Sequence, residues 1–286
     1  MTRILVAEGN TPALLHGRTE QGLAWTAEAY GAALAHFAPQ IEIEVTRPYF
    51  DGWDPGRIAF DNLDGMVVTG SGVAWSGADA RARGFWQLYE RAFASGVPAL
   101  GSCWGLQTAA VVLGGDTGAG PNGVEAGFAR EVSLTDTGRD HPLHRGREGR
   151  FDVLCMHRDD VTRLPEGAVA TATNAHTQVQ AMVYEDGTTQ FWGMQYHPEI
   201  TLSDVAYYFS RSEGACADDG FALGHSPVGM KLVDAAPDLA AIHADPSGTA
   251  ALQARYDVTG DILDFDRHAV ELRNWLTQKL GVNVAG

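Results

Sequence analysis

Along the first hundred residues, short apolar runs alternate with longer stretches in which apolar side chains recur every three or four positions. The short runs predict β-strands at residues 4–7, 41–45, 66–69 and 97–100. The longer stretches predict amphipathic helices at 25–37 and 80–95. Strands separated by helices of this length imply βαβ units and therefore a mainly parallel sheet.

The pattern changes after Leu113. Short strand-like runs then follow one another with turn-rich connections, at 128–134, 151–155, 169–173, 179–184 and 190–195. The polar stretch 135–150 predicts an exposed loop. A further helix is predicted to begin at Thr201, with Val205, Tyr208 and Phe209 on its buried face.

The last seventy residues predict helical segments that break at Pro227, Pro237 and Pro246 and end in a helix at 267–280. We therefore expect an α/β domain over residues 1–205. A mainly helical C-terminal extension, 206–286, is expected to pack on or beside that domain.

The composition is that of an ordinary globular protein. The 286 residues are 45% apolar and 20% charged, which is enough for a sizeable core. The formal net charge of −16 argues against binding to nucleic acid or to anionic membranes, because both attract positive charge. No apolar run approaches the roughly 20 residues that span a bilayer, and the first residues lack the pattern of a signal peptide. Three scattered cysteines do not make a disulfide framework, so a reducing cytoplasm is the expected location.

The first candidate for chemistry is Cys103. It stands in the sequence Gly-Ser-Cys-Trp-Gly at 101–105, which follows a predicted strand and precedes a helical run at 106–113. Strand, sharp turn and helix are the setting of a nucleophile elbow, and the glycines leave room for its strained turn. The dipole and free N–H groups of a helix N-terminus also stabilise a thiolate. The alternative interpretation is a small buried cysteine in a glycine turn.

A cysteine nucleophile needs a base, and the base needs a partner that orients it. The sequence Tyr-His-Pro-Glu at 196–199 directly follows the predicted strand 190–195 and supplies both. His197 and Glu199 can reach one site from the end of that strand, and Pro198 stiffens the link between them. Taken alone, His-Pro-Glu indicates a surface turn. With the elbow in the same chain, it indicates a general base and its partner.

A glycine-rich loop, Thr-Gly-Ser-Gly at 69–72, ends another predicted strand. Its glycines, Gly70 among them, let the backbone turn N–H groups toward a substrate oxyanion. The expected oxyanion hole combines the backbone N–H of Ser71 with that of Trp104, and each such donor contributes about 3 kcal/mol of transition-state stabilisation. Without the other two motifs, this loop would be interpreted as an ordinary glycine turn.

Together the three motifs resemble class I glutamine amidotransferases, and in particular the glutaminase domain of GMP synthase and its free-standing relatives. The resemblance covers residues 1–205. It implies an α/β, flavodoxin-like three-layer sandwich with a mainly parallel central sheet. It also implies a triad of Cys103, His197 and Glu199 that cleaves glutamine through a γ-glutamyl thioester, releases ammonia and then hydrolyses the thioester.

The resemblance further implies which residues bind the substrate. Gln107 falls where the family places a glutamine that touches the substrate. Met-His-Arg-Asp at 156–159 falls on the family's Ser-His-Gly-Asp segment, whose backbone helps to hold the amino-acid end of the substrate. The expected substrate-binding residues are therefore Gly70, Gln107, His157, Arg158 and Asp159.

Three departures from the family pattern bear on the substrate. Ser71 replaces the second glycine of the family's Gly-Gly-Pro loop, and no proline follows, so the oxyanion hole can be shaped differently. Arg158 stands in place of a glycine and could favour a substrate with an added carboxylate. The segment 8–22, with His16 and Arg18, is longer than the family's usual first turn and is expected to cover the site or to meet a partner.

Two other signals are set aside, so no cofactor or metal is expected. Residues 118–123 fit Gly-x-Gly-x-x-Gly, but they follow a helix and contain a proline, which argues against a dinucleotide site. His141 and His144 have a spacing seen in metal ligands, yet they lie in the polar stretch. Cys155, in a strand with apolar neighbours, is expected in the core.

The leading functional hypothesis is a free-standing glutamine amidotransferase-like enzyme that acts on a small molecule and can pass ammonia to a separate synthetase. A phosphate-binding loop of the Gly-x-x-x-x-Gly-Lys-[Ser/Thr] type is missing from the sequence, and residues 206–286 are too few for an ATP-dependent amidating domain. One alternative is a γ-glutamyl hydrolase or peptidase, which uses the same thioester chemistry on a different leaving amine. The other is a regulatory or binding module with a retired site.

Overall fold

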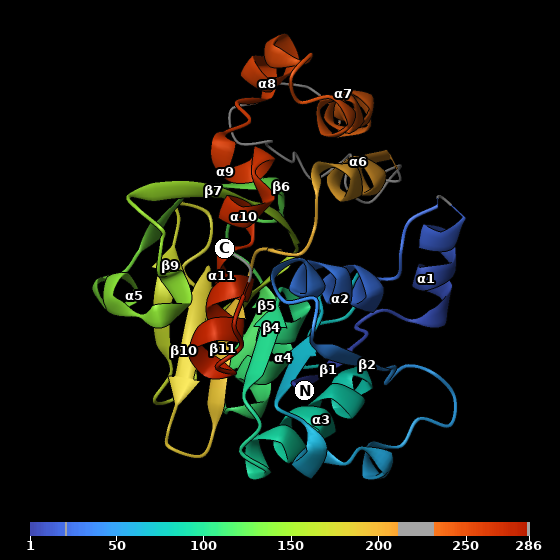
Figure 1. Ribbon diagram of the computed structural model, residues 1–286, viewed down its shortest axis with the longest axis vertical. Helices are drawn as coiled ribbons and strands as arrows, with labels where there is room; N and C mark the ends of the chain where they lie inside the picture. The colour runs from blue at the N-terminus through green and yellow to red at the C-terminus, as the bar shows by residue number, and fades with distance from the viewer. Residues whose placement is uncertain (21, 211–231, 285–286) are drawn as a thin grey trace.

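The structure of the chain is a computed structural model that describes residues 1–20, 22–210 and 232–284. Within these ranges, its centre is a nine-stranded sheet in the order β2-β1-β3-β4-β11-β10-β9-β6-β7 (Figure 1). The first five strands of that order are parallel, namely β2 (Glu42–Thr46), β1 (Arg3–Ala7), β3 (Gly65–Val68), β4 (Ala99–Ser102) and β11 (Gln190–Met194).

The other four strands are antiparallel to their neighbours, namely β10 (Ala181–Glu185), β9 (Val169–Thr173), β6 (Glu125–Leu134) and β7 (Arg150–His157). A separate antiparallel pair joins β5 (Asp116–Ala119) to β8 (Asp159–Arg163). This pair was not predicted from the apolar pattern, because its strands are short and polar.

Two apolar cores cover opposite faces of the sheet, because successive side chains of a strand point to opposite sides. In β1, Ile4 and Val6 join the core that contains α2 (Thr26–Phe37) and α11 (Val270–Asn274). Leu5 and Ala7 join the core of α3 (Arg83–Ala94) and α4 (Trp104–Val112). The predicted three-layer α/β fold is therefore confirmed.

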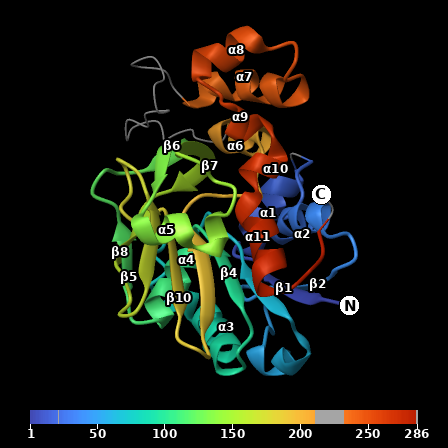
Figure 2. The ribbon, with the colours of Figure 1, turned by 60° about the vertical axis from the view of Figure 1, so that its left-hand side comes forward.

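A third core lies at the end of the molecule drawn at the top of Figures 1 and 2, where α6 (Leu202–Ser210) packs against α7 (Leu232–Ala244). From there α8 (Ala250–Tyr256), α9 (Gly260–Leu263) and α10 (Phe265–His268) lead down to α11 beside the sheet, and a π-helical turn, Trp275–Lys279, follows. The remaining helices are α1 (Pro12–Thr19), α5 (Asp136–Asp140) and the 3₁₀ turns Pro55–Arg57, Phe60–Asn62, Ala80–Ala82 and Pro142–His144.

Two details of the sequence-based prediction were wrong. Pro237 does not break a helix but lies inside α7, whose apolar face, with Leu239 and Ile242, is buried against α6 and offsets the lost backbone hydrogen bond. The stretch 135–150 is not simply an exposed loop, since it contains α5 and buries His144 against Glu271 of α11 and Thr171 of β9. The predicted break at Pro246 is confirmed, and that at Pro227 lies outside the described residues.

Every strand predicted from the apolar pattern is present, with ends that differ by at most three residues. The apolar pattern located these strands well because each is buried on at least one face. Within the described ranges, no helix is both long enough and apolar enough to cross a bilayer.

Candidate active site

Cys103 occupies a strained turn between β4 and α4. Its backbone has φ 51° and ψ −109°, a conformation that costs a residue with a side chain about 1–3 kcal/mol. The turn is fixed because the Cys103 N–H donates to the carbonyl of Met194 in β11 at 2.7 Å. A Cβ atom on Gly105 would collide with the carbonyl of Val68, so the glycine is required for α4 to pack on β3. The elbow geometry predicted from the sequence is therefore present.

The His197 imidazole lies beside the elbow and is oriented by a carboxylate. Its Nδ1 atom is 2.8 Å from Oε1 of Glu199, and both side chains are buried. Although burial disfavours the charged imidazole, the negative charge of Glu199 and the hydrogen bond and charge of Cys103 raise the pKa of His197 well above its ordinary value. This arrangement favours the charged imidazolium form of His197 beside Cys103.

The third predicted motif, the loop 69–72, touches the same imidazole. A Cβ atom on Gly70 would overlap Cε1 of His197, so the ring rests directly on the backbone of this loop. The loop is held by Asn10, whose Oδ1 accepts the N–H of Gly72 at 2.9 Å. Elbow, imidazole and loop are thus brought together from the ends of three parallel strands, β4, β11 and β3, as is usual for sites on such sheets.

Two backbone N–H groups beside the elbow are the ones predicted from the sequence to bind an oxyanion. Among the described residues, neither the N–H of Ser71 nor that of Trp104 has a hydrogen-bond acceptor. Trp104 is the first residue of α4, where backbone donors have no partner within the helix. The two groups named from the sequence as oxyanion donors are therefore unpaired.

A cavity of about 320 Å³ opens on Cys103. Its walls combine the loop after β3 with the end of β7, and they include Ser71, Trp75, Trp104, Gln107, Met156, His157, Arg158 and Asp159. The predicted substrate-binding residues Gln107, His157, Arg158 and Asp159 all line this cavity, whereas Gly70 does not and lies against His197.

The side chains of these residues are largely engaged with one another. Nε2 of Gln107 donates to the carbonyl of Asp159. Arg158 pairs with the Asp159 carboxylate at 2.8 Å and donates to the carbonyl of Ala74 at 3.0 Å, so its charge is already neutralised. Arg158 thereby ties the two walls of the cavity together. A role in recognising an added carboxylate stays a prediction.

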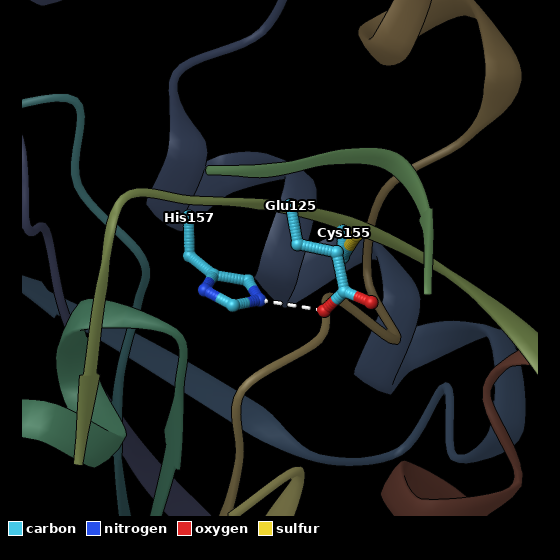
Figure 3. A group of neighbouring side chains, drawn as sticks. All are labelled: Glu125, Cys155 and His157. Atoms are coloured by element: carbon cyan, nitrogen blue, oxygen red, sulfur yellow. Dashed lines mark hydrogen bonds and ion pairs between the residues drawn. The ribbon is translucent and has the colours of Figure 1, made fainter. Parts of the chain in front are cut away.

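The His157 side chain is fully buried and lies next to two carboxylates. Its Nε2 is 2.9 Å from Glu125 (Figure 3), and its Nδ1 is 3.1 Å from Asp160. Burial opposes the charged form, but the neighbouring carboxylates of Asp160 and Glu125 raise the pKa of His157 to about 10. The charged His157 ring therefore holds the end of β7 in place through its two carboxylate partners.

Glu125, Cys155 and His157 also place three possible metal-ligand atoms within 4.8 Å of one another. However, the Glu125 carboxylate already accepts hydrogen bonds from His157, Asn174 and Gln180. Burial raises the pKa of the Cys155 thiol well above its ordinary value, which keeps the sulfur protonated. These three side chains therefore form a hydrogen-bonded buried cluster and do not fit a metal site. Cys155 belongs to the core, as predicted.

Sequence reasoning missed the groups that hold the backbone of His197 and the side chain of Tyr196 in place. The carbonyl of His197 accepts a 2.8 Å hydrogen bond from Nε2 of His268, and the hydroxyl of Tyr196 donates to Glu271 at 2.9 Å. Glu271 is completely buried and pairs with Arg147. No motif marks these residues, because they lie far along the chain in α10 and α11.

The fold and the site define an α/β protein that presents a cysteine on a strand–turn–helix elbow beside an imidazole–carboxylate pair. Residues 31–211 match the family described as Glutamine amidotransferase class-I, and the chain belongs to this family of amide-cleaving enzymes.

Two kinds of relatives differ in how much of the chain they match. A γ-glutamyl-L-1-hydroxyisopropylamide hydrolase of a Pseudomonas species is 35% identical over 224 residues, which are 76% of this chain and 74% of that protein. A GMP synthase of Shewanella baltica is 38% identical over 116 residues, which are 39% of this chain and 22% of that protein. The matched part is thus about three-quarters of the hydrolase and about a fifth of the synthase.

Solved structures agree on the fold. A glutamine amidotransferase from Methylobacillus flagellatus is 19% identical, with a TM-score of 0.63 and coverage of 100% of this chain and 96% of that chain. One from Thermotoga maritima is 17% identical, with a TM-score of 0.58 and coverage of 98% of both chains. The predicted family and fold class are confirmed.

Proposed function

We propose that this chain is a hydrolase that cleaves γ-glutamyl amides through a thioester on Cys103. The observation that carries the proposal is the position of the strained Cys103 elbow, which opens on a cavity of about 320 Å³ and lies beside the His197–Glu199 pair. The similarity to the γ-glutamyl-L-1-hydroxyisopropylamide hydrolase along three-quarters of both chains supports this choice of substrate class.

In the proposed reaction, the Cys103 thiolate attacks the γ-carbonyl carbon and forms the S–C bond of a tetrahedral intermediate. The N–H groups of Ser71 and Trp104 bind its oxyanion and contribute about 3 kcal/mol each. The C–N bond breaks as the His197 imidazolium gives its proton to the leaving amine. Glu199 keeps the ring oriented and its charge balanced.

The second half of the reaction regenerates the enzyme. A water molecule attacks the thioester carbonyl while neutral His197 accepts a proton from it. The S–C bond then breaks, glutamate leaves, and Cys103 returns as a thiolate beside the imidazolium. In this scheme the γ-glutamyl group occupies the larger cavity, held by Gln107 and by the backbone of Arg158 and Asp159.

A second candidate is a glutamine amidotransferase proper, in which the amine is ammonia and a separate synthetase consumes it. The 38% identity to the glutaminase part of GMP synthases favours it. The larger cavity and the elbow serve both functions equally well, so only the leaving amine separates them.

The test is direct. Purified protein is incubated with glutamine and with a series of γ-glutamyl alkylamides, and free amine, ammonia and glutamate are measured by mass spectrometry, with Cys103→Ala as control. We expect amine release that depends on Cys103. Turnover of glutamine alone would favour the amidotransferase, and a pull-down for a synthetase would follow. No turnover of any substrate would favour a module with a retired site.

A further inference from the structure

A second, smaller cavity of about 40 Å³ adjoins the larger one and is lined by His197. The two cavities share the loop residues Ser71 and Gly72 and the side chain of Met156. Cys103 lines the larger cavity, while His197 and Glu199 line the smaller one. The reacting groups therefore line two adjoining cavities.

The smaller cavity is enclosed by segments that lie outside the three motifs. Arg18 comes from α1, Thr26 and Ala29 come from α2, and Tyr208 comes from α6, with Ile200 at the loop before it. The N-terminal segment 8–22, which is longer than the family's usual first turn, thus reaches the site through Arg18.

The charges around this cavity already have partners. The Arg18 guanidinium is 2.8 Å from Asp204, and it donates to the Tyr208 hydroxyl at 2.9 Å and to the Ala24 carbonyl at 2.8 Å. Oε1 of Glu199 is paired with His197, and its buried Oε2 has no hydrogen-bond partner among the described residues. An anionic group entering the cavity would lose its water and face the Glu199 carboxylate, which is unfavourable. An uncharged group would meet Ala29, Ile200 and the aliphatic stem of Arg18.

The chemistry decides which part of a substrate enters which cavity. The leaving nitrogen must lie next to His197 to take its proton, whereas the acyl carbon must lie next to Cys103. If the proposed γ-glutamyl amide hydrolysis holds, the acyl part fills the larger cavity and the amine part faces the smaller one. We infer that the smaller cavity is the leaving-amine pocket and selects γ-glutamyl amides of small alkylamines that carry no anionic group.

The volume sets the size limit. One water-sized group needs about 10–15 Å³, so a cavity of about 40 Å³ holds only a few non-hydrogen atoms beyond the nitrogen. A methyl, ethyl or isopropyl group fits, and an aromatic ring does not. Each buried methylene in such a pocket changes kcat/KM by about tenfold or more. Isopropylamide should therefore be a better substrate than glutamine, and benzylamide a worse one.

Ala29 offers a sharp test, because α2 also contains a matched control. Ala29→Val adds two methyl groups to the pocket wall, while Ala32→Val makes the same change on the exposed side of the same helix. We measure kcat/KM of both variants for glutamine and for the γ-glutamyl methylamide, isopropylamide and benzylamide, and we check folding by thermal unfolding.

For Ala29→Val we expect kcat/KM to fall at least tenfold for the isopropylamide and less than threefold for glutamine and the methylamide. Ala32→Val should leave all four values unchanged. An equal fall for every substrate, or wild-type turnover of the benzylamide as fast as of the isopropylamide, would overturn the inference alone. Cys103-dependent turnover of glutamine with none of the alkylamides would overturn it together with the proposed hydrolase, and no turnover at all would reject any catalytic role.

Discussion

The Nε2 atom of His268 donates a hydrogen bond of 2.8 Å to the backbone carbonyl of His197. Burial, together with the positive charge of Arg147, lowers the pKa of His268 to about 4, so the ring is neutral at pH 7. A carbonyl can only accept, which fixes the proton on Nε2. Three residues further on, Glu271 accepts the hydroxyl of Tyr196. The helices α10 and α11 therefore hold two consecutive residues, Tyr196 and His197, through His268 and Glu271.

We predict that His268→Leu lowers kcat about threefold to tenfold with little change in KM. The variant removes one hydrogen bond and leaves the buried carbonyl of His197 unpaired, which costs about 1–2 kcal/mol. The change affects the position of the His197 base and not the substrate cavity. His268→Gln keeps a donor and should recover part of kcat. Steady-state kinetics and thermal unfolding are compared for both variants. A purely structural role would lower the melting temperature and leave kcat of the folded protein unchanged.

A second prediction concerns pH. The negative charge of Glu199 raises the pKa of His197, so its removal must lower that pKa. His197 then loses the proton that it donates to the leaving amine at a lower pH. The alkaline limb of the kcat/KM profile therefore shifts to lower pH. For Glu199→Gln we expect this shift and a loss of about 10²–10⁴-fold at the optimum, as for other triads that lose the orienting carboxylate. An unmoved alkaline limb would contradict the assignment of Glu199.

The contact between Gly70 and His197 gives a steric prediction. Gly70→Ala places a methyl group where Cε1 of His197 lies, so the ring or the loop must move. Because a displacement of about 1 Å can cost about 100-fold in rate, we expect kcat to fall by that order. Gly118→Ala is the control, since a Cβ atom there meets open space. Retained activity in Gly70→Ala would show that the imidazole does not need its present position.

Sequence reasoning located the candidate residues that belong to short motifs at strand ends. Cys103, His197 and the loop 69–72 each follow a buried strand, and parallel strands bring such ends together. It missed Asn10 and His268 because their contacts join residues 62 and 71 positions apart, with no periodic pattern to mark them. It noted Arg18 but not its role, since the partner Asp204 lies 186 residues away.

The Arg18–Asp204 pair yields a stability prediction. Their side chains are 5% and 13% exposed, so Arg18→Met leaves Asp204 as a buried, uncompensated charge. Such losses cost about 3–5 kcal/mol, measured as the free energy of unfolding in urea. Arg57→Met is the control, because the Arg57–Asp54 pair is 80% and 54% exposed and should contribute less than about 1 kcal/mol. Equal effects would mean that solvent screens the Arg18 pair as well. The double variant with Asp204→Asn should recover part of the loss.

The last prediction links His268 to stability below neutral pH. Its folded pKa of about 4 lies below the ordinary value of 6.5, so the unfolded chain binds the proton more readily. Stability from the neutral ring is therefore complete above pH 6.5 and is lost as the pH falls toward 4, by about 3 kcal/mol at most. His268→Leu, which cannot titrate, should show a flatter dependence of the free energy of unfolding between pH 6.5 and 4 than the wild type. Parallel curves would mean that His268 takes up its proton in the folded state as readily as in the unfolded one.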